Sequence, residues 1–530
     1  MNNPDERTAV EQFGKGDKYV GVCLLMVTMP GLPMFGHGQI EGFTEKYGME
    51  YRRAYLDEPV DEHLVRRHEA EIFPLMRRRR LFSGAENFAL FDFVRTDGVV
   101  DENVFAYTNQ VEGERALILY NNVYERTAGT IHTSTAINVG SADSPRLVRR
   151  SLSEALALDA AEGAYYAFRD HKTGLEYLRS GRELAEVGLF AELSGYEWHA
   201  FIDWREIRDA DGRWGELARR LGGRPAASVE RARREMELAP VLEPYRLVLE
   251  ALLALVADPK EAVRSAALDR ELRRFLEAAA AFAGSAGERS GEPAGRSTAA
   301  REAAADLALL LRPELALSEA GLGRETRARL VAGGDWREDP ALLRSLLLSA
   351  VFRAAESLAG TDAREEADGG RRRAGTLIDE WFLDRKAEER FAGPAGDPDA
   401  ARLEILLAQI VSAREETLAA ESARAPLGRS AVLGSLFADP AAAEYLVIHE
   451  HEGVSYLIEE RLEGLTRALV PAALLSLRRS GRLDDRSARA VSDAANRILA
   501  AGETAGYRVA GLLGPEAPPL GPPKRTDRPG

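Results

Sequence analysis

The chain has 530 residues, of which 45% are apolar and 29% are charged, and its formal net charge is −15. This composition is that of a globular protein and excludes a disordered chain or a membrane protein. The negative charge argues against nucleic-acid binding, because phosphate groups are bound by a concentrated basic face. At roughly 150 residues per domain, the length predicts about three domains.

The single cysteine, Cys23, lies in the apolar run 20–29 and is expected to be a small buried hydrophobic residue. One cysteine forms no disulfide within the chain, so no oxidising compartment is required. The run is too short to cross a bilayer, which takes about 20 apolar residues. No signal peptide opens the sequence. We therefore expect a cytoplasmic protein that does not contact a membrane.

The first 85 residues predict alternating helix and strand. An apolar helix over 17–29 ends at a Pro-Gly pair, and a short apolar strand follows over 32–35. A second helix is predicted over 61–80, with Asp61 as its N-cap and arginines opposite its apolar face.

Residues 86–205 have a different pattern, with short β-rich runs separated by Gly, Asp and Asn turns. Ser151 and Glu154 have the spacing of a capping box that opens a short helix. The spacing of the runs predicts an antiparallel sandwich. The runs are 88–93, 104–108, 116–120, 165–168, 175–178 and 188–204.

Residues 206–510 predict a helical domain, because leucine and alanine recur there at three- and four-residue intervals. No fixed-period repeat indicates a solenoid. The stretches 284–297 and 360–375 are rich in Gly, Ser, Glu and Arg and are predicted to be mobile loops. The tail 511–530 is rich in Pro and Gly and is predicted to be disordered.

The functional signal lies in Pro30-Gly-Leu-Pro-Met-Phe-Gly-His-Gly-Gln-Ile-Glu-Gly-Phe43. Its polar groups follow a short strand, and in a parallel barrel that end of a strand faces the active site. By spacing alone, an ordinary strand-to-loop turn is the alternative. The stretch resembles the Pro-Gly-x-Pro … Gly-x-x-x-Gly segment at the eighth barrel strand of the α-amylase superfamily of glycoside hydrolases. The resemblance covers roughly residues 1–125, and it departs from the family's Gly-Gln-Glu order at 38–41.

The resemblance implies that His37, Gln39 and Glu41 lie on the substrate side and bind sugar. For His37 a structural role satisfied by backbone is the alternative, and for Gln39 and Glu41 the alternative is an ordinary surface position.

The extreme N-terminus, Asn2-Asn3-Pro4-Asp5, falls where the family has an Asn-His-Asp motif. The resemblance makes Asp5 the aspartate that stabilises the transition state and Asn3 its neighbour. Pro4 stands where the family has a histidine that contacts sugar.

The resemblance implies a multidomain fold. Residues 1–85 would be the C-terminal end of a (β/α)8 TIM barrel, 86–205 an antiparallel β-sandwich-like accessory domain, and 206–510 a large all-helical extension. A retaining glycosidase uses two carboxyl groups about 5–5.5 Å apart. In this family they come from strands four and five, which would precede Met1.

We therefore expect a C-terminal fragment of an α-amylase-type enzyme. It would act on α-glucans by retaining hydrolysis or by transfer of α-glucosidic bonds, and would be inactive alone. Its partners would be an α-glucan or oligosaccharide and the polypeptide that holds the missing barrel strands. No cofactor is predicted. The alternative is a non-catalytic subunit, carbohydrate-associated or protein-binding, that carries a decayed amylase remnant.

One further pattern, His449-Glu-His-Glu452, lacks the spacing of the H-E-x-x-H zinc signature. Both histidines would share one face only in an extended strand. A solvated turn is the favoured interpretation and a metal site the alternative.

Overall fold

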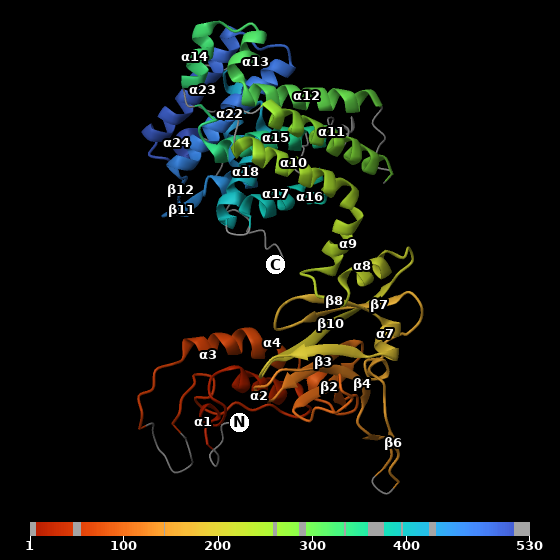
Figure 1. The fold of residues 1–530 in the computed structure, drawn as a ribbon. Coiled ribbons are helices and arrows are strands. Elements are labelled where there is room, and N and C mark those ends of the chain that lie inside the picture. Colours follow the sequence, from red (N-terminus) through yellow and green to blue (C-terminus); the bar gives the residue numbers. More distant parts are fainter. Residues whose placement is uncertain are drawn as a thin grey trace. The chain divides into compact units, whose positions relative to one another are not determined.

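The computed structural model describes residues 7–45, 55–141, 144–257, 262–285, 293–332, 335–358, 376–393, 396–422 and 431–513. The chain divides into two compact units, Met1–Met236 and Glu237–Pro529. The first unit is built around a β-sheet and the second from helices (Figure 1).

The first unit has an eight-stranded sheet of order β8-β7-β10-β3-β2-β1-β4-β9, and its strand pairs are antiparallel. A separate two-stranded sheet pairs β5 with β6. The strands are β1 (Ala89–Arg95), β2 (Val104–Val111), β3 (Glu114–Asn121), β4 (Thr127–Ser134), β5 (Ile137–Asn138), β6 (Leu147–Val148), β7 (Ala164–Asp170), β8 (Glu176–Ser180), β9 (Leu189–Leu193) and β10 (Trp198–Arg208).

Both faces of this sheet are covered, which explains why β3 reads as an unbroken apolar run. Its residues Ile118 and Tyr120 pack in one core with helix α2, whereas Leu117 and Leu119 pack in a second core on the opposite face. Successive side chains of a strand point to opposite faces. A central strand covered on both sides therefore needs apolar residues at every position.

Short helices supply the two covers. The cover that contains α2 also includes α1, α3, η1, α4 and α5, and the opposite cover includes α6 and α7. Helix α8 packs in a smaller core with β7 and β8. Their bounds are α1 (Ala9–Phe13), α2 (Asp17–Thr28), α3 (Glu62–Arg67), the π-helix η1 (His68–Ile72), α4 (Phe73–Met76), α5 (Arg79–Phe82), α6 (Leu152–Ala155), α7 (Gly181–Glu186) and α8 (Arg213–Leu221).

The predicted end of a TIM barrel is wrong. No strand of the described residues pairs in parallel, and the predicted strand 32–35 belongs to no sheet. Pro33 lacks a backbone N–H for a ladder, and α2 buries its apolar residues against an antiparallel sheet instead. The sandwich is also corrected, because the predicted β-rich runs join one sheet and not two facing sheets.

The helix predicted over 61–80 is interrupted. Asp61 does cap α3, because its Oδ1 accepts the backbone N–H of Leu64 at 3.1 Å. The chain then makes the π-helix η1 and restarts at α4, where Pro74 occupies the first turn. Proline cannot donate to the preceding turn, and a π-turn is one way to absorb that missing bond.

The second unit is a helical domain around one apolar core, with α15 among its most buried helices. A short hairpin, β11 (His449–His451) and β12 (Val454–Tyr456), is its only sheet within the described residues. The helices are α9 (Val229–Glu237, at the junction of the units), α10 (Ala239–Ala257), α11 (Ala262–Ser285), α12 (Pro293–Leu311), α13 (Pro313–Glu319), α14 (Arg324–Ala332), α15 (Pro340–Leu358), α16 (Thr376–Glu380), α17 (Leu383–Ala392), α18 (Pro398–Arg414), α19 (Thr417–Ser422), α20 (Ala431–Phe437), α21 (Pro440–Tyr445), α22 (Glu459–Arg479), α23 (Asp485–Thr504) and α24 (Val509–Leu513).

The predicted loops and tail lie largely outside the described residues. Of the stretch 284–297, the described residues end α11 or begin α12 and are helical, which corrects the prediction there. The stretch 360–375 and the tail from 514 onward are not described, whereas residues 511–513 end helix α24, which corrects the predicted disorder there. None of the described helices is long and apolar enough to cross a bilayer.

Candidate functional site

The segment 30–45, which carries the sequence signal, leaves α2 through a pinned turn. Gly31 adopts a left-handed φ of 118° and donates its N–H to the carbonyl of Ser83 at 3.2 Å. The Arg79 guanidinium donates to the carbonyl of Val27 at 2.8 Å and also to that of Gly31. The start of the segment is therefore fixed to the end of α2 and to α5.

Residues 32–36 expose apolar side chains on one side. Leu32 is 91% exposed and Met34 is 63% exposed. Phe35 turns inward, with its ring edge-on to His68 at 5.4 Å and to Phe73 at 6.3 Å. Among the described residues, the backbone N–H groups of Leu32, Met34 and Phe35 have no hydrogen-bond partner. Exposed and inward-facing side chains alternate along the segment as they do in a strand, but no strand of the described residues pairs with it.

A buried polar centre lies beneath this segment. The Tyr19 hydroxyl donates to the carbonyl of Gln39 at 3.0 Å and lies 2.9 Å from Nε2 of His68. Because the hydroxyl hydrogen goes to the carbonyl, Nε2 of His68 must be the nitrogen that donates to Tyr19. Nδ1 of His68 is buried and has no partner in the described part of the chain. The imidazole is therefore neutral.

The pKa values of this centre agree with a neutral state. Burial lowers the pKa of His68 to about 4, against the opposing charges of Glu41 and Glu71. Burial raises the pKa of the Cys23 thiol to about 12, although hydrogen bonds with Tyr19 and Gln39 oppose the shift. A thiol with so high a pKa is not a nucleophile at neutral pH, so Cys23 has the buried, unreactive character that was predicted.

The candidate sugar-binding residues fall in this same segment but differ in exposure. His37 is exposed, with its ring 6.3 Å from that of Phe43. Gln39 is wholly buried. Glu41 is half-buried, and its carbonyl accepts the N–H of Asp61 at 3.0 Å. Their contact with substrate stays a prediction, and for the buried Gln39 side chain such contact requires the segment to move.

The other two candidates, Asn3 and Asp5, lie outside the described residues. Their predicted roles as a substrate-binding residue and as the transition-state-stabilising aspartate therefore stay predictions.

Two glutamates tie the end of the segment to residues 55–58. The Glu58 carboxylate accepts the N–H of Thr44 at 2.8 Å and that of Glu45 at 2.8 Å. The Glu45 carboxylate accepts the N–H groups of Tyr55 at 2.7 Å and Leu56 at 2.9 Å. These bonds hold two further exposed apolar side chains, since Tyr55 is 71% and Leu56 is 55% exposed.

A second polar centre of the first unit had no recognised sequence signal. Asp170 is wholly buried and accepts from Nδ1 of His199 at 3.0 Å and from the Thr173 hydroxyl at 2.8 Å. Burial alone would raise the pKa of Asp170, but the hydrogen bond and charge of His199 outweigh it and lower the pKa. In a catalytic triad, a carboxylate orients a histidine, and the histidine in turn activates a nucleophile. In the described residues, however, no hydroxyl or thiol hydrogen-bonds to Nε2 of His199, so the pair lacks a nucleophile.

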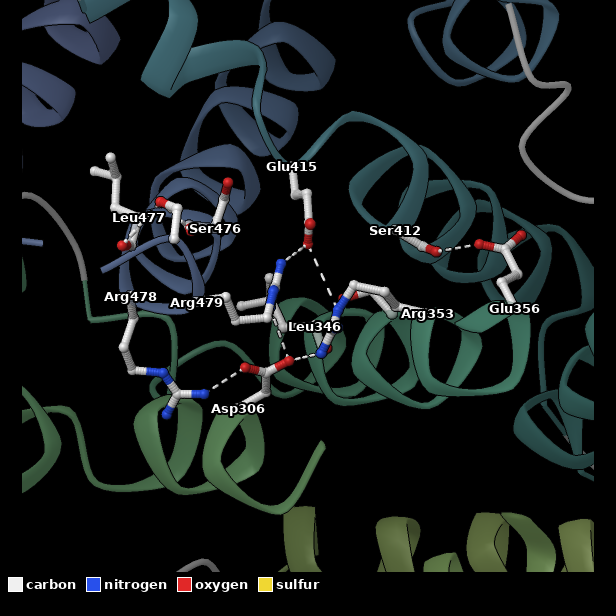
Figure 2. Close-up of polar contacts among 12 residues, drawn as sticks. Asp306, Leu346, Arg353, Glu356, Ser412, Glu415, Ser476, Leu477, Arg478 and Arg479 are labelled. Carbon is white, nitrogen blue, oxygen red and sulfur yellow. Dashed lines mark hydrogen bonds and ion pairs between the residues drawn. The ribbon is translucent and has the colours of Figure 1, made fainter. Parts of the chain in front are cut away.

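The second unit contains a buried cluster of charges. Figure 2 shows Asp306 of α12 among the guanidinium groups of Arg353 from α15 and of Arg478 and Arg479 from α22. The Asp306 side chain is fully buried, 2.6 Å from Arg478 and 2.9 Å from Arg479. Glu415, directly after α18, pairs with Arg353 and Arg479.

These three arginines and two carboxylates join α12, α15, α18 and α22. Burial lowers the pKa of Arg353 to about 10, and the charge of Arg479 adds to that effect, so Arg353 is still charged at neutral pH. A carboxylate surrounded by guanidinium groups does not act as a general base or nucleophile, because the guanidinium groups stabilise its ionised form and occupy its oxygens. The cluster is therefore structural.

The second unit also has an open hollow of 360 Å³ between α15, α18, α21 and α22. Its carboxylates include Glu404, which forms a two-pronged ion pair with Arg344, and Asp339, which caps α15. Both carboxylates hold helices, and the exposed Glu460 and Glu463 of α22 also line the hollow.

The possible metal pair lies in the β11–β12 hairpin. His449 and His451 are exposed, and the His449 ring stacks on Tyr456 at 6.0 Å. Within the described residues, no group of three or more His, Cys, Asp or Glu side chains could hold a metal ion.

No protein-family model matches the chain, and no curated protein is similar to it at a significant level.

Proposed function

We propose that the first unit is the accessory, docking part of an α-glucan-active enzyme of the α-amylase type. In this proposal residues 32–36 bind a second polypeptide, and that polypeptide supplies the two catalytic carboxyl groups. The observation that carries the proposal is the exposure of Leu32 and Met34 on a segment in which the backbone N–H groups of Leu32, Met34 and Phe35 have no partner among the described residues. The choice of α-glucans rests on the similarity of residues 30–43 to the α-amylase superfamily.

The physical argument is the cost of leaving this segment uncovered. Burying a Leu or Met side chain contributes about 1.5–3 kcal/mol. Within the described chain Leu32, 91% exposed, obtains almost none of it, and Met34, 63% exposed, obtains only part. Unpaired backbone N–H groups of an extended segment are a template for another strand. The pinned turn at Gly31 and the inward ring of Phe35 hold the segment in place. A strand-bearing partner would bury both apolar side chains and pair the backbone.

The alternative of a complete active site in this chain has less support. The buried carboxylates Asp170 and Asp306 are each held by cationic or hydrogen-bonding partners. A retaining glycosidase instead places two carboxyl groups about 5–5.5 Å apart across the scissile bond.

The docking proposal is tested by placing the photo-crosslinking residue p-benzoylphenylalanine at Leu32 of the full chain in its native cells. The matched control has it at Leu147, which is 66% exposed on β6. We expect one polypeptide to crosslink at Leu32 and not at Leu147, and mass spectrometry to identify it. Equal labelling from both positions, or crosslinks only between copies of this chain, would contradict the proposal.

The enzymatic part is tested with maltoheptaose. The purified chain is expected to leave it intact, whereas the chain mixed with the crosslinked partner is expected to cleave it. Hydrolysis by the chain alone that is lost on Asp5→Ala would show that the catalytic groups lie within this chain.

A further inference from the structure

Two tyrosines form an exposed aromatic corner on the first unit, on the loops that follow β3 and β9. Tyr124 is 80% exposed, and Tyr196 is partly buried beside it. Their ring centroids are 6.3 Å apart and their planes are inclined by 56°. Single exposed apolar residues are common on protein surfaces, so the argument depends on how these loops are built.

A buried asparagine locks the two loops together. The Asn121 side-chain amide donates to the carbonyls of Glu125 at 2.7 Å and Ser194 at 3.0 Å. Its oxygen accepts the N–H of Val123 at 3.3 Å. The carbonyl of Val123 in turn accepts the N–H of Tyr196 at 2.9 Å. Both tyrosines therefore sit on backbone that is fixed from within.

The backbone at the corner is also unusual. A Cβ at Gly195 would lie 2.1 Å from the carbonyl oxygen of Tyr124, so only glycine allows the loops to approach this closely. Tyr196 has a φ of 56°, the left-handed region that a bulky side chain rarely adopts. Strain of this kind persists where the surrounding structure enforces it, and it clusters at binding sites. One face of the Tyr196 ring is covered by Lys18, whose Nζ lies 5.8 Å from the centroid.

We propose that this corner is a binding site for a neutral oligosaccharide, with one pyranose ring stacked on the open face of Tyr124. Tyrosine offers a flat, rigid contact area at low cost in conformational entropy, which suits the apolar C–H face of a sugar ring. The exposed neighbours Asn122 and Glu125 bring hydrogen-bonding groups for hydroxyls.

Charge selects the neutral class. Glu125 and Glu197 stand on the two loops, whereas Glu192 beside them is paired with Arg126 at 2.6 Å and Lys18 lies over Tyr196, so the local charges largely offset one another. The whole chain carries −15, and this overall charge disfavours anionic sugars. Proline-rich peptides are the other ligands of exposed aromatic residues, but they dock in grooves lined by several rings, whereas this site has one open ring and one covered ring. The site is inferred independently of the proposed function, and only the choice of an α-glucan as probe rests on it.

The test is a calorimetric titration of the full chain with maltoheptaose, with cellohexaose and with a proline decapeptide. We expect saturable binding of maltoheptaose. Tyr124→Ala should weaken it by about tenfold, because loss of the stacked ring removes about 1.4 kcal/mol. Tyr124→Phe keeps the ring and should bind within about threefold of the wild-type chain. The control Phe190→Ala removes another exposed aromatic ring, 51% exposed on β9, and should change nothing.

Three results would overturn the proposal: no saturable binding of either sugar, undiminished binding by Tyr124→Ala, or binding of the peptide in place of the sugars. Tyr124 is exposed, so Tyr124→Ala should unfold at the wild-type temperature, and a loss of binding then reports the site. Binding of cellohexaose alone would keep the site and contradict the α-glucan assignment of the proposed function. Failure of the Leu32 crosslink would contradict the docking proposal without affecting this titration.

Discussion

Two of the buried polar centres, one in each unit, are satisfied in opposite ways. In the first unit, Tyr19, Gln39 and His68 form a neutral hydrogen-bonded centre. In the second unit, Asp306 is buried as an ion among three arginines. Burying an ion is costly unless it is fully paired, whereas a buried histidine avoids that cost by staying neutral. The stability of the ionic centre therefore depends on all of its partners, and the stability of the neutral centre depends on pH.

The largest effect is expected from Asp306→Asn. This change leaves three buried guanidinium groups without their shared carboxylate, and breaking a buried pair costs about 3–5 kcal/mol. The free energy of unfolding of the second unit, measured by urea denaturation, should fall by that amount. Asp493→Asn, which removes an exposed ion pair with Arg329, should cost less than about 1 kcal/mol. Equal losses of unfolding free energy in the two variants would show that the ion pairs of Asp306 contribute no more to stability than an exposed ion pair does.

The next effect is the pH dependence of the first unit. The pKa of His68 is about 4 when folded, below its ordinary value of 6.5, so the unfolded chain binds more protons between these values. Stability from the neutral ring is complete above pH 6.5 and is lost as the pH falls to about 4, about 3 kcal/mol in all.

His68→Gln keeps a side-chain N–H for Tyr19 but does not titrate. Denaturation curves between pH 7 and pH 4 should therefore be flatter for this variant than for the wild-type chain. Parallel pH profiles would mean that folding does not shift the pKa of His68.

A smaller loss is expected from Gly21→Ala, which tests how closely α2 must approach the sheet above the neutral centre. A Cβ at Gly21 would lie 2.0 Å from the buried ring of Tyr120. Overpacking of this kind costs about 1–3 kcal/mol, and the gain in helix propensity offsets up to about 1 kcal/mol of it. The thermal midpoint should fall for Gly21→Ala and stay unchanged for Gly84→Ala, where a Cβ meets open space. An unchanged thermal midpoint for Gly21→Ala would mean that α2 can move away from β3.

The smallest effect is expected from Leu32→Ser combined with Met34→Ser. These side chains are exposed, so the free energy of unfolding of the chain alone should change by less than about 0.5 kcal/mol. Leu24→Ala, at a fully buried position of α2, should cost about 2–5 kcal/mol. A large loss in the double variant would mean that residues 32–36 are covered within this chain.

Local patterns in the sequence predicted local structure well. The helix that ends at Pro30, the Asp61 cap and the Ser151–Glu154 capping box all appear, because each depends on residues within one or two turns. The parallel barrel failed because proline and glycine at 30–38 specify where the chain turns but not which strand lies beside it. The pairing of β10 with β3 and β7 is set by residues far apart in sequence.

The polar centres were missed for the same reason. Asp170 and His199 are 29 residues apart, and Asp306 and Arg478 are 172 apart. The local sequence around a lone Asp in a helix, or around an Arg-Arg pair at a helix end, does not indicate which distant residue it will contact. The substrate-binding role of the candidate residues at 37–41 stays a prediction, and the burial of Gln39 depends on Tyr19 and His68, which spacing alone does not reveal.

Because Asp306 and the arginines of α22 are far apart in sequence, the ribosome makes Asp306 well before them. At about 5–20 residues per second, a ribosome needs roughly 10–30 s to make the 172 residues from Asp306 to Arg478. During that time Asp306 and Arg353 have been made while both arginines of α22 are missing. Until α22 has been made, Asp306 has Arg353 alone of these three guanidinium partners.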